Sequence, residues 1–398
     1  MEPCVNPFLT LDNVDVSGKK VFLRLDLNMP SDHKGKIIDA TRLHASLKTL
    51  KTLKEKGAKT LIVTHRGRPK GSEKHLSTEG LIPLLKEALY SNVIFAKDIT
   101  SAAEIMNREQ KDAYVLLENI RFWKGEEEND SAFAENLASL ADVYVNDAFA
   151  VSHRKHASVY GVAKRIGVRV AGYNLLTEVQ YLKNVCENPS AFTLSLIGGS
   201  KVSTKIKLLK NLLTLSKVVI PGGGMANTFL VAAGVLEPGK SFYEEDFIEE
   251  VRALLNENRL KILLPIDAVV TDRLNHPPLT MTLDSINIHP KYTIVDIGPK
   301  TVQMIKDKAS LATTILWNGP FGIFEEPPFD KGSNHIADIL AEQTAKGTTT
   351  IAGGGDTLAC LGEKKGKLSF VSTAGGAFLE YLEECTLPGI KVLYRNLY

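Results

Sequence analysis

The chain has 398 residues, more than one typical hydrophobic core holds, so two domains are expected. Hydrophobic residues make up 44% of the sequence and charged residues 24%, as in ordinary globular proteins, and the net charge is +2. This balance gives no support to a protein that binds nucleic acid or anionic membranes through its overall charge, so any basic site must be local.

The four cysteines, at positions 4, 186, 360 and 385, are far apart and form no Cys-x-x-Cys motif. Their spacing favours free thiols in a reducing cytoplasm over a disulfide framework. The first residues lack a basic segment followed by an apolar run, so no secretory signal is expected. No long heptad run is present, which favours a monomer.

The first half alternates short apolar runs with segments of helical period. Strands are expected at residues 20–27, 60–64, 93–95, 114–117 and 143–145. Leu43, Leu47, Leu50 and Leu53 fall on one helical face, and Gly57 follows as a stop signal. Alternation of this kind predicts a parallel sheet with helices on both faces.

A further helical period covers residues 174–186, and the sequence Glu-Asn-Pro-Ser at 187–190 ends it. The domain boundary is placed at this helix. Residues 1–170 then form a first domain, residues 171–188 a connecting helix and residues 189–386 a second domain.

In the second half, apolar runs repeatedly end in glycine. Such turns occur at residues 197–199, 220–224, 297–298, 317–319, 351–355 and 373–376. Ligands of open α/β sheets bind beyond the carboxyl ends of the strands, where glycine lets the backbone approach them closely. Helix capping explains any one of these turns but not their recurrence. The alternating apolar residues at 281–288 suggest a small group of short strands.

Residues 218–236 contain no charged side chain and equal the minimum length of a membrane-spanning helix. Pro221, the glycines at 222–224 and the pair Asn227-Thr228 would break such a helix. A buried strand, a glycine turn and a core helix account for all of these residues, so no membrane span is expected.

Lys201 and Lys205 follow the turn Gly198-Gly199 and are expected in the first turn of a helix. Lysine is unfavourable at that end of a helix because the dipole is positive there, unless an anion lies between the two side chains. The lysines, the glycine N–H groups and the helix terminus therefore suggest a phosphate site. Two solvated surface lysines remain the alternative.

The familiar nucleotide motifs, Gly-x-x-x-x-Gly-Lys-Ser/Thr and Gly-x-Gly-x-x-Gly after a strand, are absent. The run Gly353-Gly354-Gly355-Asp356-Thr357 instead places a carboxylate at a helix start. Asp356 can be a simple N-cap, or it can hold Mg²⁺ on the phosphates of a nucleotide. Glu325, beyond another strand end, could accept hydrogen bonds from ribose hydroxyls, although exposed glutamates are common.

The first half carries arginines and one histidine after its strand ends. Each arginine alone is explained as a solvated or ion-paired surface residue. Together at the carboxyl ends of successive strands they would form a concave basic site suited to phosphate and carboxylate. A small, highly anionic substrate is therefore expected. The set consists of Arg24, Asp26, Asn28, Arg42, His65, Arg68, Arg121 and Arg154.

The sequence of these segments resembles that of the phosphoglycerate kinase family over nearly the whole chain. The resemblance lies in the blocks beginning at Arg24, His65, Leu117, Asn146, His153, Gly198, Gly222, Trp317, Gly353 and Ser372, which occur in the order that the family has them. It implies an α/β fold of two doubly wound parallel-sheet domains, joined by a helix and separated by a deep cleft. It also implies that residues 387–398 return to the first domain.

The implied reaction is reversible transfer of the acyl phosphate of 1,3-bisphosphoglycerate to Mg-ADP, giving 3-phosphoglycerate and ATP, with a hinge closure that unites the domains. On matching positions, the glycerate would be held by Asp26, Asn28, Arg42, His65, Arg68, Arg121 and Arg154. The nucleotide would be held by Gly199, Lys201, Lys205, Gly223, Asn318, Glu325, Gly355, Asp356 and Thr357, with Asp356 also binding Mg²⁺. Charge stabilisation during transfer would come from Arg42, Lys205, Gly354, Gly355, Gly375 and Gly376.

The chain departs from the family pattern at five places: Arg66, Ala150, Ser200, Thr204 and Ala374. Thr204 separates the two lysines and could alter metal affinity. Two other functions stay open at this point. One is a different phosphotransferase or a dinucleotide enzyme on a similar scaffold, and the other is a nucleotide-binding scaffold protein with a decayed site.

Overall fold

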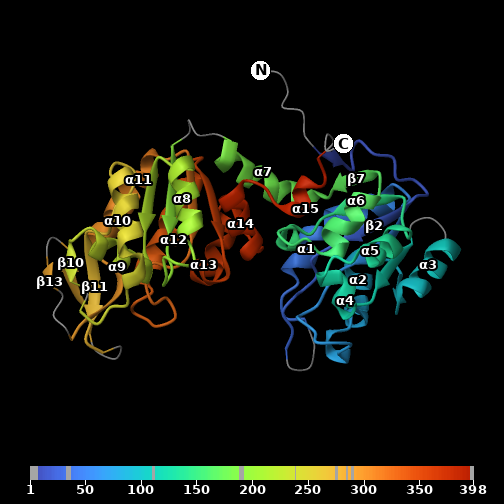
Figure 1. Cartoon of the computed structure of the whole chain (residues 1–398), viewed down its shortest axis with the longest axis horizontal. Helices are drawn as coiled ribbons and strands as arrows, with labels where there is room; N and C mark the ends of the chain where they lie inside the picture. The colour runs from blue at the N-terminus through green and yellow to red at the C-terminus, as the bar shows by residue number, and fades with distance from the viewer. Residues whose placement is uncertain are drawn as a thin grey trace, which may run out of the picture. The chain divides into compact units, whose positions relative to one another are not determined.

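The computed structural model describes residues 8–32, 37–109, 113–187, 192–237, 239–273, 277–283, 286–287 and 291–394. The chain divides into two compact units (Figure 1). Unit 1 comprises Met1–Gln180 and Thr386–Tyr398, and unit 2 comprises Tyr181–Cys385. The division falls inside one helix, α7 (Tyr173–Glu187).

Unit 1 is built on a seven-stranded sheet in which all paired strands are parallel. The order across the sheet is β1-β7-β6-β2-β3-β5-β4. The strands are β1 (Leu9–Thr10), β2 (Lys20–Arg24), β3 (Lys59–Val63), β4 (Val93–Ala96), β5 (Tyr114–Leu117), β6 (Val143–Asn146) and β7 (Val168–Ala171).

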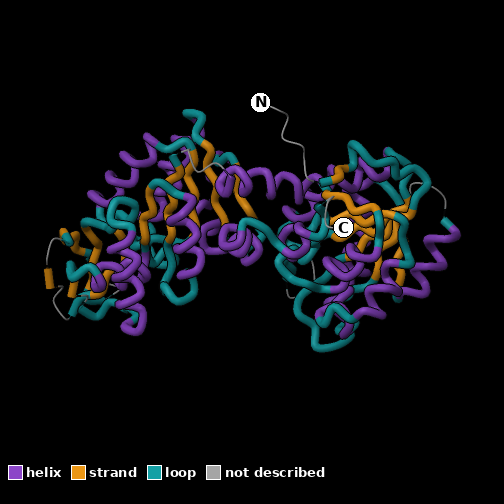
Figure 2. The backbone as a smooth tube through the Cα atoms, turned by 45° about the horizontal axis from the view of Figure 1, so that its top comes forward, coloured by secondary structure: helices purple, strands orange, loops and turns teal. Residues whose placement is uncertain are grey.

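Helices cover this sheet because its strands are apolar on both faces, as parallel strands usually are (Figure 2). All four residues of β5 and β6 are buried. The α-helices of unit 1 other than α7 are α1 (Thr41–Glu55), α2 (Ile82–Leu89), α3 (Ile99–Arg108), α4 (Lys124–Glu127), α5 (Ser131–Ala138), α6 (Val162–Arg165) and α15 (Pro388–Lys391).

Unit 2 contains a second parallel sheet, of five strands in the order β17-β16-β15-β8-β9. These strands are β8 (Thr193–Ile197), β9 (Val218–Pro221), β15 (Thr314–Asn318), β16 (Thr349–Gly353) and β17 (Phe370–Ser372). From β8, the later strands are added on both sides: β9 on one side, and β15, β16 and β17 in turn on the other. This arrangement is typical of a doubly wound fold. The α/β class with two parallel sheets is thus confirmed.

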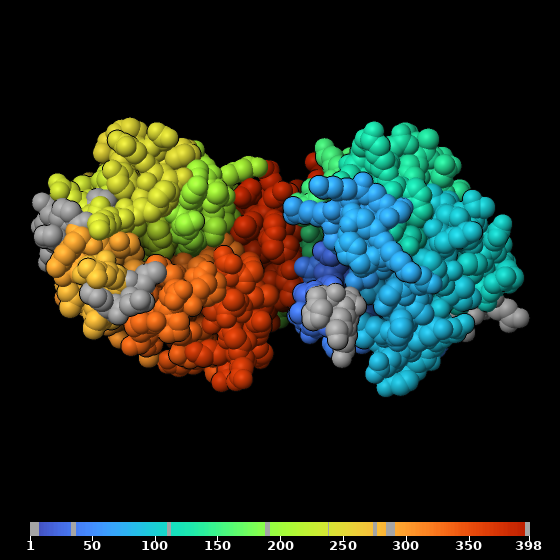
Figure 3. Space-filling model, turned by 90° about the horizontal axis from the view of Figure 1, so that it is seen from below, coloured from blue at the N-terminus to red at the C-terminus, as the bar shows by residue number. Residues whose placement is uncertain are grey.

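Several helices of unit 2 pack against one another in pairs. Helices α8 and α14 contact each other, and α11 contacts α12 (Figure 1). Figure 3 shows the later residues of unit 2, coloured orange to red, as a continuous part of the surface of that unit. The helices are α8 (Ile206–Leu215), α9 (Gly223–Ala232), α10 (Ile248–Glu257), α11 (Pro299–Leu311), α12 (Lys331–Ala345), α13 (Gly355–Leu361) and α14 (Gly376–Glu384).

Two small sheets complete unit 2. One is an antiparallel sheet with the order β12-β11-β14, and the other pairs β10 with β13. Their strands are β10 (Leu236–Glu237), β11 (Asp267–Thr271), β12 (Leu279–Thr282), β13 (Ile286–Asn287) and β14 (Thr293–Ile297). The short strands expected around 281–288 are therefore present where the structure describes that segment.

The end of the chain contacts unit 1. The backbone N–H of Gly389 donates to the carbonyl of Ser152 at 2.8 Å, and the Asn146 side chain donates to the carbonyl of Gly389 at 3.1 Å. The rings of Phe8 and Tyr394 stack at a centroid distance of 5.2 Å. Of the segment 387–398, residues 395–398 lie outside the described part of the chain.

None of the helices in the described ranges is long and apolar enough to cross a membrane. The uncharged stretch at 218–236 forms the buried strand β9, a glycine turn and the helix α9, as its glycine and proline residues predict.

Buried polar groups fix the start of α7, the helix that crosses between the units. Asp147 accepts a hydrogen bond from the N–H of Leu175 at 3.0 Å, and Thr49 accepts one from the N–H of Tyr173 at 2.9 Å. These two acceptors satisfy N–H groups that a helix terminus leaves without a partner. Burial raises the pKa of Asp147 to about 7, despite the hydrogen bonds that lower it.

We expect this carboxyl to make folding pH-dependent. Its pKa is higher in the folded chain than in the unfolded one, so the folded state binds more protons and stability falls as pH rises from about 4 to 7. Asp147→Asn should remove up to about 4 kcal/mol of this decline. Urea unfolding of both proteins across that pH range, followed by circular dichroism, measures the difference. Parallel curves for the two proteins would contradict the assignment.

Candidate functional site

In unit 1 the expected ligand-binding residues follow the carboxyl ends of four adjacent strands. Asp26 and Asn28 follow β2, His65 and Arg68 follow β3, Arg121 follows β5 and Arg154 follows β6. These strands are neighbours in the order β6-β2-β3-β5, so the residues after them gather at one edge of the sheet. Arg42 joins them from the first turn of α1.

Hydrogen bonds connect several of these side chains. Arg42 donates from Nη1 to Asp26 Oδ2 at 2.7 Å and to the carbonyl of Asn28 at 3.0 Å. The Asn28 side chain accepts from the N–H of Gly67 at 2.8 Å, and the carbonyl of Gly67 accepts from Arg121 Nη1 at 2.7 Å. Loops after β2, β3 and β5 are thereby held in one arrangement.

The buried His65 lies within the field of several arginines. Its pKa is held well below the ordinary value by burial and by the positive charges of Arg24, Arg121, Arg42 and Arg154. His65 is therefore neutral at neutral pH, and its buried Nδ1 has no hydrogen-bond partner among the residues that the structure describes. A neutral imidazole with an unused nitrogen can still exchange a hydrogen bond with a ligand.

The arginines also repel one another. Burial and the charges of Arg24 and Arg154 lower the pKa of Arg121 to about 10, although Glu127 and Glu126 act in the opposite direction. Arg154 donates from Nε to Nε2 of His153 at 3.1 Å, and Arg68 is exposed. Such a concentration of positive charge favours an anion over a neutral ligand.

A buried network lies beside this cluster. Arg24 is fully buried and donates from Nε to Ser158 Oγ at 2.8 Å, while Ser158 donates from Oγ to Glu126 Oε1 at 2.6 Å. Glu126 is also fully buried, and burial raises its pKa. The sequence signal for Arg24 was its place at a strand end, but nothing in the sequence marked Glu126 or Ser158 as its partners.

In unit 2 the centre of the expected nucleotide site is Lys205. Its Nζ donates to the carbonyl of Gly198 at 2.7 Å and to Asn318 Oδ1 at 2.6 Å, so it joins the ends of β8 and β15. Burial lowers the pKa of Lys205 to about 8, although Asp356 opposes this shift. Gly199, with φ +131°, lies so close that a Cβ there would be 3.3 Å from Nζ.

The network continues to the end of β16. Asn318 donates from Nδ2 to the carbonyl of Gly353 at 2.6 Å, and Thr357 accepts from the N–H of Gly319 at 2.7 Å. Gly354 has φ +105°, and a Cβ there would lie 2.6 Å from Asn318 Nδ2. Three neighbouring strand ends are thus tied together through Lys205, Asn318 and Thr357.

The expected start of helix α8 is wrong. The helix begins at Ile206, Lys205 is its N-cap, and Lys201 lies before the turn formed by residues 203–205. The reason is that Ser203 bonds Glu244 through its N–H at 3.0 Å and through its hydroxyl at 2.5 Å, which holds residues before Lys205 in a turn. Lys201 is exposed, with Nζ 6.0 Å from the centre of the Phe242 ring.

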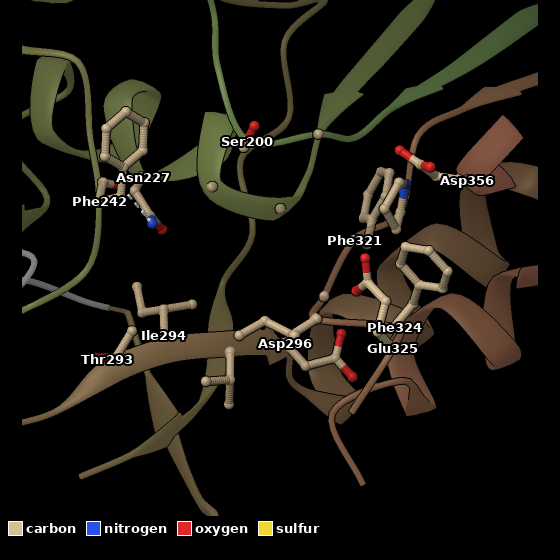
Figure 4. A pocket seen from close by; sticks show the side chains of 17 residues that line it. Ser200, Asn227, Phe242, Thr293, Ile294, Asp296, Phe321, Phe324, Glu325 and Asp356 are labelled. Carbon is tan, nitrogen blue, oxygen red and sulfur yellow. Dashed lines mark hydrogen bonds between the residues drawn. The ribbon is translucent and has the colours of Figure 1, made fainter. Parts of the chain in front are cut away.

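A cavity of about 420 Å³ opens beside these strand ends (Figure 4). From the expected nucleotide set it is lined by Gly199, Gly223, Glu325 and Asp356. Its other walls include side chains that the sequence did not single out, among them Phe242, Ile294, Asp296, Phe321 and Phe324. A cavity with apolar walls and acidic groups at one side suits a ligand that has a flat apolar part and a polar part.

Two exposed carboxylates and two open glycines lie at this site. Asp356 is in the first turn of α13, and Glu325 follows β15. A Cβ at Gly355 or at Gly375 would meet no heavy atom within 4 Å, so open space lies at both positions. Gly376 begins helix α14, next to Gly375.

The donor groups of these residues show which kind of metal site they could form. In the described ranges no group of three or more His, Cys, Asp or Glu side chains could hold a metal ion by itself. Mg²⁺ usually binds through one or two carboxylates together with phosphate oxygens. The exposed Asp356 beside the open space at Gly355 fits that donor set.

The residues that depart from the family pattern lie at the surface, at the cavity wall and in the interior. Thr204 is exposed and donates from Oγ1 to the carbonyl of Lys201 at 3.1 Å. Ser200 lines the cavity, and Ala374 is buried. Arg66 is buried and donates to the carbonyl of Ser77 at 2.7 Å.

We expect Glu126 to be essential for the stability of unit 1. Glu126→Ala leaves the buried Arg24 without its nearby negative charge, which should lower the free energy of unfolding by about 3–5 kcal/mol. Urea unfolding measures the loss. The control is Glu128→Ala, whose exposed carboxylate pairs with Lys124 at 3.3 Å and should change stability by less than about 0.5 kcal/mol. Equal losses in the two variants would show that the buried network is not stabilising.

Comparison with known proteins supports one family. The family model for phosphoglycerate kinase matches residues 11–384. Cytosolic phosphoglycerate kinase of Triticum aestivum is 44% identical over 392 residues, covering 96% of this chain and 97% of the relative. The phosphoglycerate kinase of Nostoc punctiforme is 43% identical and covers 96% of this chain and 98% of that protein.

Solved structures agree with this result. The phosphoglycerate kinase of Coxiella burnetii superposes with a TM-score of 0.91 at 37% identity, covering 98% of this chain and 100% of that one. The enzyme from Pyrococcus horikoshii gives a TM-score of 0.81 at 30% identity, with coverage of 97% and 98%. The chain therefore belongs to the phosphoglycerate kinase family and is a glycolytic phosphotransferase.

Proposed function

We propose that unit 1 holds the phosphoglycerate and unit 2 holds the Mg-nucleotide of this kinase reaction. The observation that carries the proposal is the division of charge between the strand ends of the two sheets. Arginines converge on His65 in unit 1, whereas unit 2 offers a half-buried lysine, glycine turns and a cavity. The reaction is reversible transfer of the acyl phosphate of 1,3-bisphosphoglycerate to ADP.

The glycerate would be bound through its phosphate and carboxylate groups. The ligands proposed are Asp26, Asn28, Arg42, His65, Arg68, Arg121 and Arg154. An anion at this place would relieve the repulsion that lowers the pKa of Arg121. The neutral His65 would add a hydrogen bond without adding charge, and Asp26 would hold Arg42 in position through their 2.7 Å contact.

The nucleotide would lie with its base and sugar in the cavity and its phosphates toward Lys205. Its proposed ligands are Gly199, Lys201, Lys205, Gly223, Asn318, Glu325, Gly355, Asp356 and Thr357. Of these, Asn318 and Thr357 would act by orienting Lys205 and the glycine turns, because their side chains already bond the protein. Asp356 would hold Mg²⁺, which when bound neutralises charge on the nucleotide phosphates.

The chemistry asks for charge stabilisation more than for a base. The group that leaves or attacks is a carboxylate with an ordinary pKa near 4, so no strong general base is required. Lys205 and Arg42 would stabilise negative charge on the moving phosphoryl oxygens. The N–H groups of Gly354, Gly355, Gly375 and Gly376 would add hydrogen bonds, since open space adjoins Gly355 and Gly375.

A coupled assay for ATP formation from ADP and the acyl phosphate tests the proposal through Lys205. Lys205→Ala should lower kcat by roughly 10²–10³-fold while the protein stays folded. In the wild type, kcat/KM for ADP should fall as pH rises through about 8, because Lys205 loses its proton there. Lys205→Arg should lack this alkaline decline, since a guanidinium stays protonated.

The matched control is Lys210→Ala on the same helix, whose side chain contacts Glu250 and should leave kcat unchanged. A wild-type kcat in Lys205→Ala would remove the role assigned to the lysine. An inactive wild type would favour the nucleotide-binding scaffold with a decayed site.

We also propose that transfer requires the two units to close, because the two ligand sets belong to different units. Small-angle scattering should show a smaller radius of gyration when 3-phosphoglycerate and Mg-ADP are both present than with either alone. An unchanged radius with both ligands bound would contradict hinge closure.

The setting proposed for this enzyme is the cytoplasm, and the oligomeric state proposed is a monomer. This setting is proposed because widely spaced cysteines suit a reducing compartment better than a disulfide framework. Among the similar relatives, that of Triticum aestivum and one of Arabidopsis thaliana are named as cytosolic, and two others of Arabidopsis thaliana as chloroplastic.

A further inference from the structure

A buried asparagine follows strand β5 and is not among the proposed ligands. Asn119 comes two residues after the end of β5 and two residues before Arg121, and its side chain is fully buried. A buried amide is costly unless its donor and its acceptor both have partners. In Asn119 both groups have partners, and all of these partners belong to the loops at the carboxyl edge of the unit 1 sheet.

The amide of Asn119 pairs with the backbone of Arg66 in both directions. Its Oδ1 accepts from the N–H of Arg66 at 3.2 Å, and its Nδ2 donates to the carbonyl of Arg66 at 2.8 Å. Oδ1 also accepts from the N–H of Arg121 at 3.2 Å, and Nδ2 also donates to the carbonyl of Leu76 at 2.9 Å. The amide thus joins the loop after β3, the loop after β5 and the short helix η1 (Lys74–Leu76).

The loop after β3 is the one that presents His65 and Arg68. Arg66 and Gly67 lie between these two proposed ligands, and the N–H and the carbonyl of Gly67 each bond a further proposed ligand. Gly67 has φ +61°, and a Cβ there would lie 2.8 Å from Cδ2 of Leu76. The loop is therefore held against η1 on one side and against the Asn119 amide on another.

We propose that Asn119 is a positioning residue for the phosphoglycerate: its amide fixes the backbone of Arg66 and thereby the directions in which His65 and Arg68 leave the loop. The inference rests on the glycerate site proposed for unit 1. Without the amide, the N–H and the carbonyl of the buried Arg66 would lose their partners. The loop would then have to move to reach other partners, and the two ligands would move with it.

The chemistry of the amide group explains why asparagine occupies this position. An amide offers a donor and an acceptor side by side, as a peptide group does. Aspartate has nearly the same volume and keeps the acceptor, but it replaces the two N–H donors with a second oxygen. In Asn119→Asp that oxygen would meet the carbonyls of Arg66 and Leu76 without a hydrogen to share, so the hold on Arg66 should weaken.

The side chain of Arg66 provides a matched control, because the amide holds the backbone of this residue and not its guanidinium. Arg66 donates from Nη1 to the carbonyl of Ser77 at 2.7 Å. Burial lowers the pKa of Arg66, and the charge of Glu118 opposes that shift. Arg66→Leu should therefore lower the stability of unit 1 while the hydrogen bonds between Asn119 and the backbone stay in place.

The test measures steady-state kinetics of the full-length enzyme in the direction that consumes 3-phosphoglycerate and Mg-ATP. In Asn119→Asp the KM for 3-phosphoglycerate should rise about tenfold or more, while kcat and the KM for Mg-ATP stay within about threefold of the wild type. Arg66→Leu should keep both KM values although urea unfolding shows it to be less stable. A selective rise for one substrate separates positioning from a general loss of structure.

Asn119→Ser is a second variant that brings no charge into the interior, so it is expected to fold even if the aspartate variant does not. It should show the same selective rise. The proposal is overturned if folded Asn119→Ser keeps the wild-type KM for 3-phosphoglycerate, if both KM values rise alike, or if Arg66→Leu raises the KM for 3-phosphoglycerate as much.

Arg68→Ala distinguishes failure of this inference from failure of the proposed function. It should raise the KM for 3-phosphoglycerate, because Arg68 is a proposed ligand. An unchanged KM in Arg68→Ala would show that the glycerate site itself is wrongly assigned. A raised KM in Arg68→Ala together with an unchanged KM in the Asn119 variants would overturn the positioning role alone.

Discussion

The ammonium group of Lys205 is the interaction on which the order of the unit 2 site depends. It joins the ends of β8 and β15, and Asn318 extends the same network to β16. Because it is largely withdrawn from water, its pKa is lowered to about 8, so the charge is less stable there than on a surface lysine. An anionic phosphate beside it would stabilise that charge, which connects the architecture of the sheet with the binding of nucleotide.

Unit 1 faces a related electrostatic constraint, because it holds an excess of positively charged side chains close together. Its strand ends gather arginines, and burial together with the positive charges of these arginines lowers the pKa of Arg121 and keeps His65 neutral. Hydrogen-bond acceptors inside the fold offset the energetic cost of this repulsion. Asp26 accepts from Arg42, and Ser158, which donates to Glu126, accepts from Arg24. The cluster is thus held in place before any ligand arrives, as electrostatic stabilisation of a transferring group requires.

The helix α7 is held by side-chain contacts in both units. Asp147 and Thr49 satisfy its first N–H groups in unit 1, and the ring of Tyr181 stacks on that of Phe370 in unit 2 at a centroid distance of 4.6 Å. The connection between the units is therefore an ordered element with defined contacts in both units. Its first turn is sensitive to protons, because burial raises the pKa of Asp147 to about 7.

The sequence alone determined the α/β class, the parallel strands with glycine at their ends, and the family. The strands expected at 114–117 and 143–145 appear as β5 and β6, because short β-branched and leucine-rich runs are strong local signals. The helix expected at 174–186 appears as α7 for the same reason of clear periodicity. The family and its phosphotransferase activity, expected from the motif blocks, are confirmed by the comparisons.

Tertiary structure alone decided which side chains meet. The first helical turn expected around Lys201 did not form, because Glu244, 41 residues from Ser203 in the chain, accepts hydrogen bonds from Ser203. The partners of Arg24 and the walls of the cavity likewise join residues far apart in sequence. The local sequence determines which segments form strands, helices and turns. The pKa values and the side-chain contacts depend on burial and on neighbours that only the folded sheet brings together.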